Sequence, residues 1–481
     1  MKKQTKVLLA AALFTLGASF SSMAALKNGT WQLNEDGWQY ADKEGEYVEE
    51  EWCVSYGTEY WINEEGVLGA SEWVSDAEYT YYVQSDGSKT VNAWKYIFAE
   101  DEEDADEESW FYFDAKGRMV SNTKKEINGY TYYFGEDGKM LTGWVEYDKD
   151  AKVKAIEATD KSAVSKVVYT DENGALVKSS WLHLFPYGSD EDKMYEGDDE
   201  VYYYAGSNGS LYTTKKDVEG LTYFFNKDNG QLIDGWVKKY EYDTDKYAYT
   251  ACNAADEADV IELYWTDEDS YAKKNTWRYL ECPEDNDDEF WYFFDKLGRA
   301  FLPNTASGSK VKEVTFADGE EMGTGFDFEA IANVESKKIN GVEYFFNAEG
   351  QMLDGFVTID GDMMYLEDGA VQTGKITITD ENENDYEFMF APKTIKEEGY
   401  KKGVAVNGNY DGYLYKNGQL VKSEENGVYE LVTIENVGKF IVDYRGKIQH
   451  KDGKEYEGVT GTYTFATSAK GAFEDAIKNK N

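Results

Sequence analysis

The residues of this chain best suited to binding chemistry are aromatic, and they recur in a short pattern. Two or three aromatic residues precede a polar stretch that ends in glycine, and an apolar residue follows. One copy runs from Tyr132 through Gly138 to Met140, and Trp144 comes shortly after it. Tryptophan and tyrosine rings offer flat apolar platforms and attract cations to their faces. The pattern therefore predicts repeated sites, each weak alone, that gain strength by repetition along a polymer.

Catalytic and metal-binding chemistry has little support in the residue inventory. The two histidines, His183 and His450, are far apart and lack a nucleophile motif. The three cysteines have no metal-ligand spacing, and their odd number argues against a disulfide framework. Paired carboxylates of the glycosidase kind stay open, since the chain has 94 acidic residues. We therefore expect no enzyme, no catalytic residues, no metal site and no cofactor.

The net charge of −45 narrows the range of partners. So acidic a surface repels nucleic acid, whereas it tolerates cationic ligands, divalent metals and neutral sugars. Acidic runs at 101–104, 190–192 and 284–288 recur at matching places in the repeats. None has the spacing of an EF-hand calcium loop, so we expect solvated loops rather than metal sites.

Each copy of the aromatic pattern predicts a β-hairpin. Aromatic residues favour strands, and glycine adopts a positive φ at low cost where the chain turns. We expect the residues after the glycine to begin the returning strand. An isolated hairpin is marginally stable in water, so successive hairpins must stack to cover their aromatic faces. The predicted fold is all-β, an elongated β-solenoid of stacked hairpins with acidic loop inserts.

A longer period overlies the hairpins. Trp94, Trp181 and Trp277 each precede an acidic run and another aromatic hairpin, and a glycine-centred hairpin follows each of these. Three hairpins then form a super-repeat of roughly 90 residues, and internal self-similarity of this kind is the signature of a repeat architecture. All four prolines fall between the predicted hairpins, as expected for a residue that cannot donate to a strand ladder.

The chain divides into three predicted segments. Residues 1–25 have the pattern of a secretory signal peptide, with lysines before an apolar stretch and cleavage near Ala24-Ala25. That stretch is too short to span a bilayer comfortably, so we expect no membrane association after cleavage. Residues 26–374 hold the hairpin repeats, and residues 375–481 hold divergent repeats and a C-terminal tail with one short helix. The expected location is extracellular, at the cell surface.

The sequence resembles the cell-wall-binding repeat family, which includes choline-binding modules, glucan-binding repeats and the repetitive C-terminal regions of large clostridial toxins. The resemblance rests on the aromatic triplet, the turn glycine, the Met or Leu after it and the Thr-Gly-Trp closure. It covers most of the chain from Trp31 to Ile448. In the choline-binding branch, a cage of aromatic residues between consecutive hairpins holds the ligand.

The resemblance implies roles for six aromatic residues. The closing tryptophans are Trp144 and Trp236, the opening tryptophans are Trp110 and Trp291, and Tyr132 and Tyr223 supply neighbouring rings. Elsewhere the opening position holds Thr131, Thr222 or Glu343, and the third closure carries Phe356. Few complete cages are therefore predicted, which leaves choline and sugar as alternative ligands. The competing interpretation is that these rings only pack one hairpin on the next.

The resemblance implies a secreted, non-catalytic protein that attaches non-covalently to the wall of a Gram-positive-type bacterium. Its partner would be a cell-wall polysaccharide such as glucan, or a choline-decorated teichoic acid. The alternative is a structural or adhesive surface protein whose acidic face meets another protein. An enzyme with an unrecognised carboxylate site is the third hypothesis.

Overall fold

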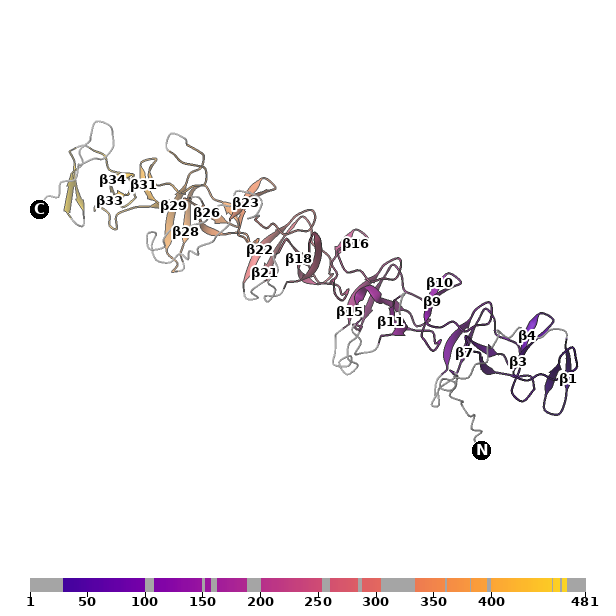
Figure 1. Ribbon diagram of the computed structural model, residues 1–481. Coiled ribbons are helices and arrows are strands. Elements are labelled where there is room, and N and C mark those ends of the chain that lie inside the picture. The colour runs from indigo at the N-terminus through magenta and orange to yellow at the C-terminus, as the bar shows by residue number, and fades with distance from the viewer. Residues whose placement is uncertain are drawn as a thin grey trace. The chain divides into compact units, whose positions relative to one another are not determined.

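The computed structural model describes residues 29–99, 108–148, 152–156, 162–187, 200–252, 260–283, 288–303, 334–359, 361–380, 382–395, 399–451, 453–458 and 461–464. The predicted signal peptide, the acidic runs up to residue 287 and the predicted C-terminal helix lie outside these residues. The described chain is all-β, and consecutive antiparallel hairpins stack on one another within two compact units, Met1–Ile233 and Asp234–Asn481 (Figure 1). The predicted all-β fold of stacked hairpins is confirmed.

The described residues of the first unit form seventeen strands and one 3-10 turn, η1 (Val164–Lys166). The strands are β1 (Thr30–Leu33), β2 (Trp38–Ala41), β3 (Glu51–Ser55), β4 (Thr58–Ile62), β5 (Glu72–Ser75), β6 (Thr80–Val83), β7 (Ala93–Ile97), β8 (Ser109–Phe113), β9 (Thr123–Ile127), β10 (Tyr130–Phe134), β11 (Gly143–Tyr147), β12 (Val153–Ala155), β13 (Val167–Thr170), β14 (Ser180–Leu184), β15 (Val201–Ala205), β16 (Lys216–Val218) and β17 (Leu221–Tyr223).

The second unit holds β18 to β36 and contains one sheet of five strands, ordered β28-β29-β32-β31-β30. The strands are β18 (Gly235–Asp243), β19 (Lys246–Ala251), β20 (Glu262–Thr266), β21 (Thr276–Glu281), β22 (Glu289–Phe294), β23 (Glu335–Ile339), β24 (Val342–Phe346), β25 (Gly355–Ile359), β26 (Asp362–Glu367), β27 (Ala370–Val371), β28 (Gly374–Thr379), β29 (Asp385–Phe390), β30 (Gly408–Tyr410), β31 (Tyr413–Lys416), β32 (Gln419–Leu420), β33 (Glu430–Ile434), β34 (Gly438–Val442), β35 (Glu455–Gly458) and β36 (Gly461–Thr464). No helix among the described residues has the length and apolar character needed to span a bilayer.

Each hairpin pairs the aromatic strand with the strand before it, and not with the residues after the turn glycine as the sequence pattern predicts. The aromatic triplet is the second strand, and it pairs with the strand before it, as β8 pairs with β7 and β10 pairs with β9. At most turns the residues after the glycine return for only a single bridge, such as Phe113 to Met119, whereas after Gly369 and Gly418 they form the short strands β27 and β32. The prediction that these residues begin the returning strand is therefore wrong for most hairpins and correct after Gly369 and Gly418. They lead instead to the next hairpin.

Tight turns at both ends of the second strand explain where each hairpin begins and ends. Asn128 and Gly129 join β9 to β10 with φ of 51° and 87°, the paired positive values of a type I′ turn. After β8, a side-chain oxygen of Asp114 accepts the backbone N–H groups of Lys116 and Arg118 at 2.8 and 3.0 Å. This turn reverses the chain without needing a further strand.

Two contacts recur at most steps from one hairpin to the next. The residue two places after the turn glycine, here named the post-turn residue, donates its amide to the second strand of the preceding hairpin. Met140 donates to the carbonyl of Trp110 at 2.8 Å, and Met352 donates to that of Trp291 at 2.8 Å. In addition, the turn glycine Gly138 lies against the side chain of Met119, the preceding post-turn residue, so closely that a Cβ would collide with its sulfur.

The core is a series of small clusters between neighbouring hairpins rather than one central core. Tyr112 and Phe134, from β8 and β10, share a cluster with Val120 and Ile127. Tyr133 of β10 packs with valines of β11 to β13 in the following cluster. Because each hairpin relies on its neighbours for burial, contacts concentrate between hairpins that are close in sequence, as in other repeat proteins.

The glycine contact predicts a measurable cost when Gly138 is replaced. Gly138→Ala adds a Cβ at φ +81°, against Met119. Gly129→Ala is the matched control, because Gly129 has φ +87° but no heavy atom within 4 Å of a Cβ. Both variants carry the backbone strain, and we expect Gly138→Ala to lose about 1–3 kcal/mol more, the usual cost of overpacking. Equal losses of unfolding free energy in urea titrations would show that the stacking contact contributes nothing.

Candidate aromatic ligand sites

Three aromatic positions meet at the step between consecutive hairpins, and together they are named an aromatic set. The first is a tryptophan on the first strand. The second is the opening residue, three places before the end of the second strand. The third is a tyrosine on the second strand of the next hairpin. At the step after β7 and β8, Trp94 lies with its ring centroid 6.2 Å from that of Trp110 and 4.9 Å from that of Tyr132, both edge to face.

Four steps in the described chain carry aromatic residues at all three positions, and they are spaced by three hairpins. The four aromatic sets are Trp31, Trp38 and Tyr60; Trp94, Trp110 and Tyr132; Trp181, Tyr202 and Tyr223; and Trp277, Trp291 and Tyr344. The first three lie in the first unit and the fourth lies in the second. Three of the sets thus lie one per predicted super-repeat, and the set at Trp31 precedes the first of these.

The opening ring is the exposed member of each aromatic set. The exposed fractions of Trp38, Trp110, Tyr202 and Trp291 are 46%, 45%, 45% and 44%. The other two members of each set are half-buried. A ring with one free face and an aromatic neighbour at its edge is the arrangement that receives a flat sugar or a cation.

An aromatic residue on the paired strand holds the opening ring in three of the four sets. Tyr96 lies 5.1 Å from Trp110, Tyr279 lies 5.3 Å from Trp291, and His183 stacks on Tyr202 at 4.1 Å. These cross-strand pairs are the unit by which antiparallel sheets gain side-chain stability. The opening rings are therefore positioned before any ligand arrives.

Tyr132 keeps its proton at neutral pH. Burial raises the pKa of Tyr132, and the nearby carboxylate of Asp171 raises it further. A neutral phenol leaves the face of the ring electron-rich and its hydroxyl able to donate a hydrogen bond.

The closing tryptophans Trp144 and Trp236 have a different environment. The indole N–H of Trp144 donates to the carbonyl of Phe185 at 3.1 Å, and that of Trp236 donates to the carbonyl of Glu281 at 2.9 Å. Trp236 also meets the edge of buried Tyr292 at 4.7 Å. Both side chains are half-buried. Their polar atoms thus tie one hairpin to the next, which is a packing role.

The structure groups the six predicted residues differently from the resemblance. It brings Trp110 to Tyr132, but their tryptophan partner is Trp94 and not Trp144. Tyr223 meets Trp181 rather than Trp236. The residues that sequence reasoning missed as contacts include Trp94, Trp181 and Trp277, which it had used only as markers of the super-repeat. Their regular spacing was the available signal, because one tryptophan recurred with each complete repeat.

One step of the same design already holds an ammonium group. At the step after β3 and β4, Trp52 and Tyr81 occupy the tryptophan and tyrosine positions, and Glu59 is the opening residue. The ammonium of Lys89 lies 3.9 Å from the centre of the Trp52 ring and 4.8 Å from that of Tyr81. Its Nζ forms an ion pair with Glu59 at 2.7 Å, and the side chain is buried.

The described residues offer little for catalysis or metal binding. Within these ranges, no group of three or more His, Cys, Asp or Glu residues is placed to hold a metal ion. Nδ1 of His183 lies 3.2 Å from a carboxylate oxygen of Glu200, with both side chains well exposed. The three cysteines, Cys53, Cys252 and Cys282, are not joined by disulfide bonds.

These features define a repeat protein of stacked β-hairpins with aromatic sites between the hairpins. No family model matches the chain, and no curated protein matches it. Among solved structures it is similar to the modular autolysin LytC from Streptococcus pneumoniae, at 18% identity and a TM-score of 0.36, over 69% of this chain and 52% of LytC. The chain thus spans about half the length of LytC.

Two further solved structures from Streptococcus pneumoniae are similar over most of their own length. CbpJ matches at 17% identity and a TM-score of 0.36, over 77% of this chain and 99% of CbpJ. Choline binding protein F matches at 16% identity and a TM-score of 0.25, over 82% of this chain and 98% of that protein. Its name belongs to the branch of repeats that the sequence resembles. At such low TM-scores the likenesses carry no weight in the assignment that follows.

Because the closing and opening tryptophans differ in their contacts, we expect their replacement by alanine to lower the free energy of unfolding by different amounts. Trp236→Ala removes the hydrogen bond to Glu281 and the contact with Tyr292, so we expect a loss of about 3 kcal/mol, at the low end for a tryptophan truncation. Trp291→Ala removes a ring that is 44% exposed and is expected to cost about 1 kcal/mol or less. Urea unfolding of both variants checks the split, and a larger loss for Trp291→Ala would contradict it.

Proposed function

We propose that this protein is a secreted, non-catalytic module that binds ammonium groups of a bacterial cell-wall polymer, such as choline-decorated teichoic acid, through its four aromatic sets. The observation that carries the proposal is the position of Lys89. Its ammonium group occupies the space between a tryptophan and a tyrosine at a step equivalent to those of the four sets. At Trp94, Trp110 and Tyr132 the post-turn residue is Met140, which packs on the rings but carries no charge, so an external cation would meet the exposed face of Trp110.

The energetics favour a repetitive ligand. One cation–π contact contributes roughly 0.5–2 kcal/mol, so a single aromatic set binds weakly. A polymer that engages several sets gains by effective concentration, which multiplies the separate affinities. The net charge of −45 adds a general attraction for cations and disfavours polyanions without compensating positive groups. Glucan is the alternative ligand, since the exposed opening rings also suit sugars.

The first test is retention on purified walls that carry choline. The double variant Trp110→Ala with Trp291→Ala removes the opening rings of two aromatic sets, both about half-exposed. We expect retention to fall by roughly 100-fold, more than the single losses combined, because avidity depends on the number of sites. Sedimentation of protein with the walls gives the measurement.

The control for this test is Tyr56→Ala, which removes a fully exposed tyrosine outside the aromatic sets. It is expected to leave retention unchanged. Free choline should release the wild-type protein, and soluble glucan should not. Release by glucan alone would transfer the proposal to sugar, and unchanged retention of a folded double variant would falsify it.

The second test removes the ammonium group of Lys89 from the step after β3 and β4. Met119, Met140 and Met352 are post-turn residues like Lys89, so Lys89→Met is compatible with the hairpin step. The variant leaves no cation beside Trp52, Tyr81 and the carboxylate of Glu59. We expect calorimetry to count one more choline site per chain than in the wild type. Choline should also raise the Tm of the variant more than that of the wild type, because ligands stabilise the state they bind.

The matched control is Lys43→Met, which removes an exposed lysine that only meets its neighbour Glu44. The number of choline sites should stay the same in this variant. If Lys89→Met folds but gains neither a site nor a larger shift of Tm, the equivalence between this step and the aromatic sets is wrong.

A further inference from the structure

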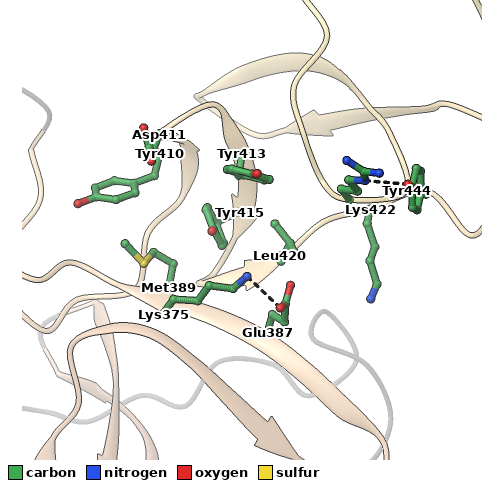
Figure 2. Close-up of a pocket in the computed structure, with 11 residues that line it drawn as sticks. Lys375, Glu387, Met389, Tyr410, Asp411, Tyr413, Tyr415, Leu420, Lys422 and Tyr444 are labelled. Atoms are coloured by element: carbon green, nitrogen blue, oxygen red, sulfur yellow. Dashed lines mark hydrogen bonds and ion pairs between the residues drawn. The ribbon is translucent and has the colours of Figure 1, made fainter. Parts of the chain in front are cut away.

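A cavity lies in the second unit, on the five-stranded sheet formed by β28 to β32. Its volume is about 470 Å³, within the ~300–1,000 Å³ typical of small-molecule sites. Figure 2 shows its side chains, and four of them are tyrosines: Tyr410, Tyr413, Tyr415 and Tyr444. None of its lining residues belongs to an aromatic set. The cavity is therefore a separate site.

The floor of the cavity is rigid. Tyr415 and Leu420 are opposite each other in the pairing of β31 with β32, and both are buried. Tyr410 and Tyr413 are paired across the turn between β30 and β31, and Tyr413 is 36% exposed. Burial raises the pKa of Tyr415 to about 12, so its hydroxyl stays protonated at neutral pH. The cavity thus combines aromatic faces with fixed hydroxyl groups.

Three basic side chains surround these tyrosines. Lys375 forms an ion pair with Glu387 at 2.9 Å, so these two charges offset each other. The guanidinium of Arg445 donates from Nε to the hydroxyl of Tyr444 at 2.7 Å, and this bond orients it (Figure 2). Arg445 and Lys422 form no ion pair with any residue that the structure describes.

The charge of the cavity contrasts with that of the chain. Acidic residues outnumber basic ones 94 to 49 overall. Around the cavity, Arg445 and Lys422 have no carboxylate partner, and Asp411 is the one carboxylate that is not paired with a lysine. Unpaired cations beside aromatic rings favour a ligand that carries negative charge on a ring-sized body.

We propose that this cavity binds an anionic sugar unit, one that carries a carboxylate or a phosphate group. The tyrosine rings stack on the sugar, the hydroxyl groups of Tyr413 and Tyr415 bond to its hydroxyls, and Arg445 and Lys422 hold the anion. This site differs from the aromatic sets, which lack basic residues at their three positions. Its ligand is accordingly of opposite charge.

The experiment is calorimetric titration of the full chain with three probes: glucose, glucuronate and glucose 6-phosphate. We expect at least one anionic probe to bind about tenfold more tightly than glucose, the effect of one charge-assisted contact. Tighter binding of glucuronate identifies a carboxylate-bearing sugar, and tighter binding of glucose 6-phosphate identifies a phosphate-bearing one. If neither binds more tightly than glucose, the proposal is overturned.

Two variants show whether binding occurs in this cavity. Lys422→Gln combined with Arg445→Gln should abolish the preference for anionic probes, and Tyr413→Ala should weaken all sugar binding. The control is Lys439→Gln, an exposed lysine on β34 that does not line the cavity. Circular dichroism confirms that each variant is folded. Unchanged titration of the folded double variant would place the binding elsewhere and overturn the proposal.

Discussion

Most of the described stack depends on one repeated contact, in which a turn glycine lies against the post-turn residue of the hairpin before it. The contact at Gly138 leaves no room for a Cβ, and the same relation joins Gly174 to Met140 and Gly369 to Met352. A backbone hydrogen bond accompanies it at step after step, from a post-turn amide to an opening carbonyl. Hairpins of two strands are marginal alone, so this step converts many weak elements into a stack.

The same step determines where ligands are able to bind. The carbonyl of Trp110 accepts the amide of Met140, so the backbone of the opening residue is held while its side chain is left at the surface. Replacing the side chain does not alter that hydrogen bond. Opening positions therefore hold Glu59, Thr131 or Leu263 without loss of the stack. Binding capacity can change from hairpin to hairpin while the fold stays constant.

Much of this arrangement is predictable from the sequence, and the failures have a physical cause. Aromatic triplets and turn glycines predict the strands, the stacking and the three-hairpin period. The sequence analysis paired each aromatic strand with the residues after it, whereas the structure pairs it with the strand before it. Either pairing is compatible with the sequence of one hairpin, and packing against the neighbouring hairpins determines which of them forms. Trp94 was used only as a marker of the super-repeat because an acidic run separates it from Trp110 in the sequence, although the two residues lie on paired strands. Sequence separation concealed a direct contact.

The positions of the basic residues follow from the acidity of the chain. With 94 acids against 49 bases, a lysine or arginine on the surface finds carboxylates nearby, and most such pairs contribute little. A basic residue placed among aromatic rings is therefore informative. Lys89 is buried between Trp52 and Tyr81 and balanced by Glu59, so it completes a site from within. Arg445 stands beside Tyr444 without a carboxylate partner among the described residues, so its charge is left for a ligand. The ammonium of Lys89 is thus part of the fold, and the rings around it are already occupied. The guanidinium of Arg445 lines an open cavity and is available to a ligand.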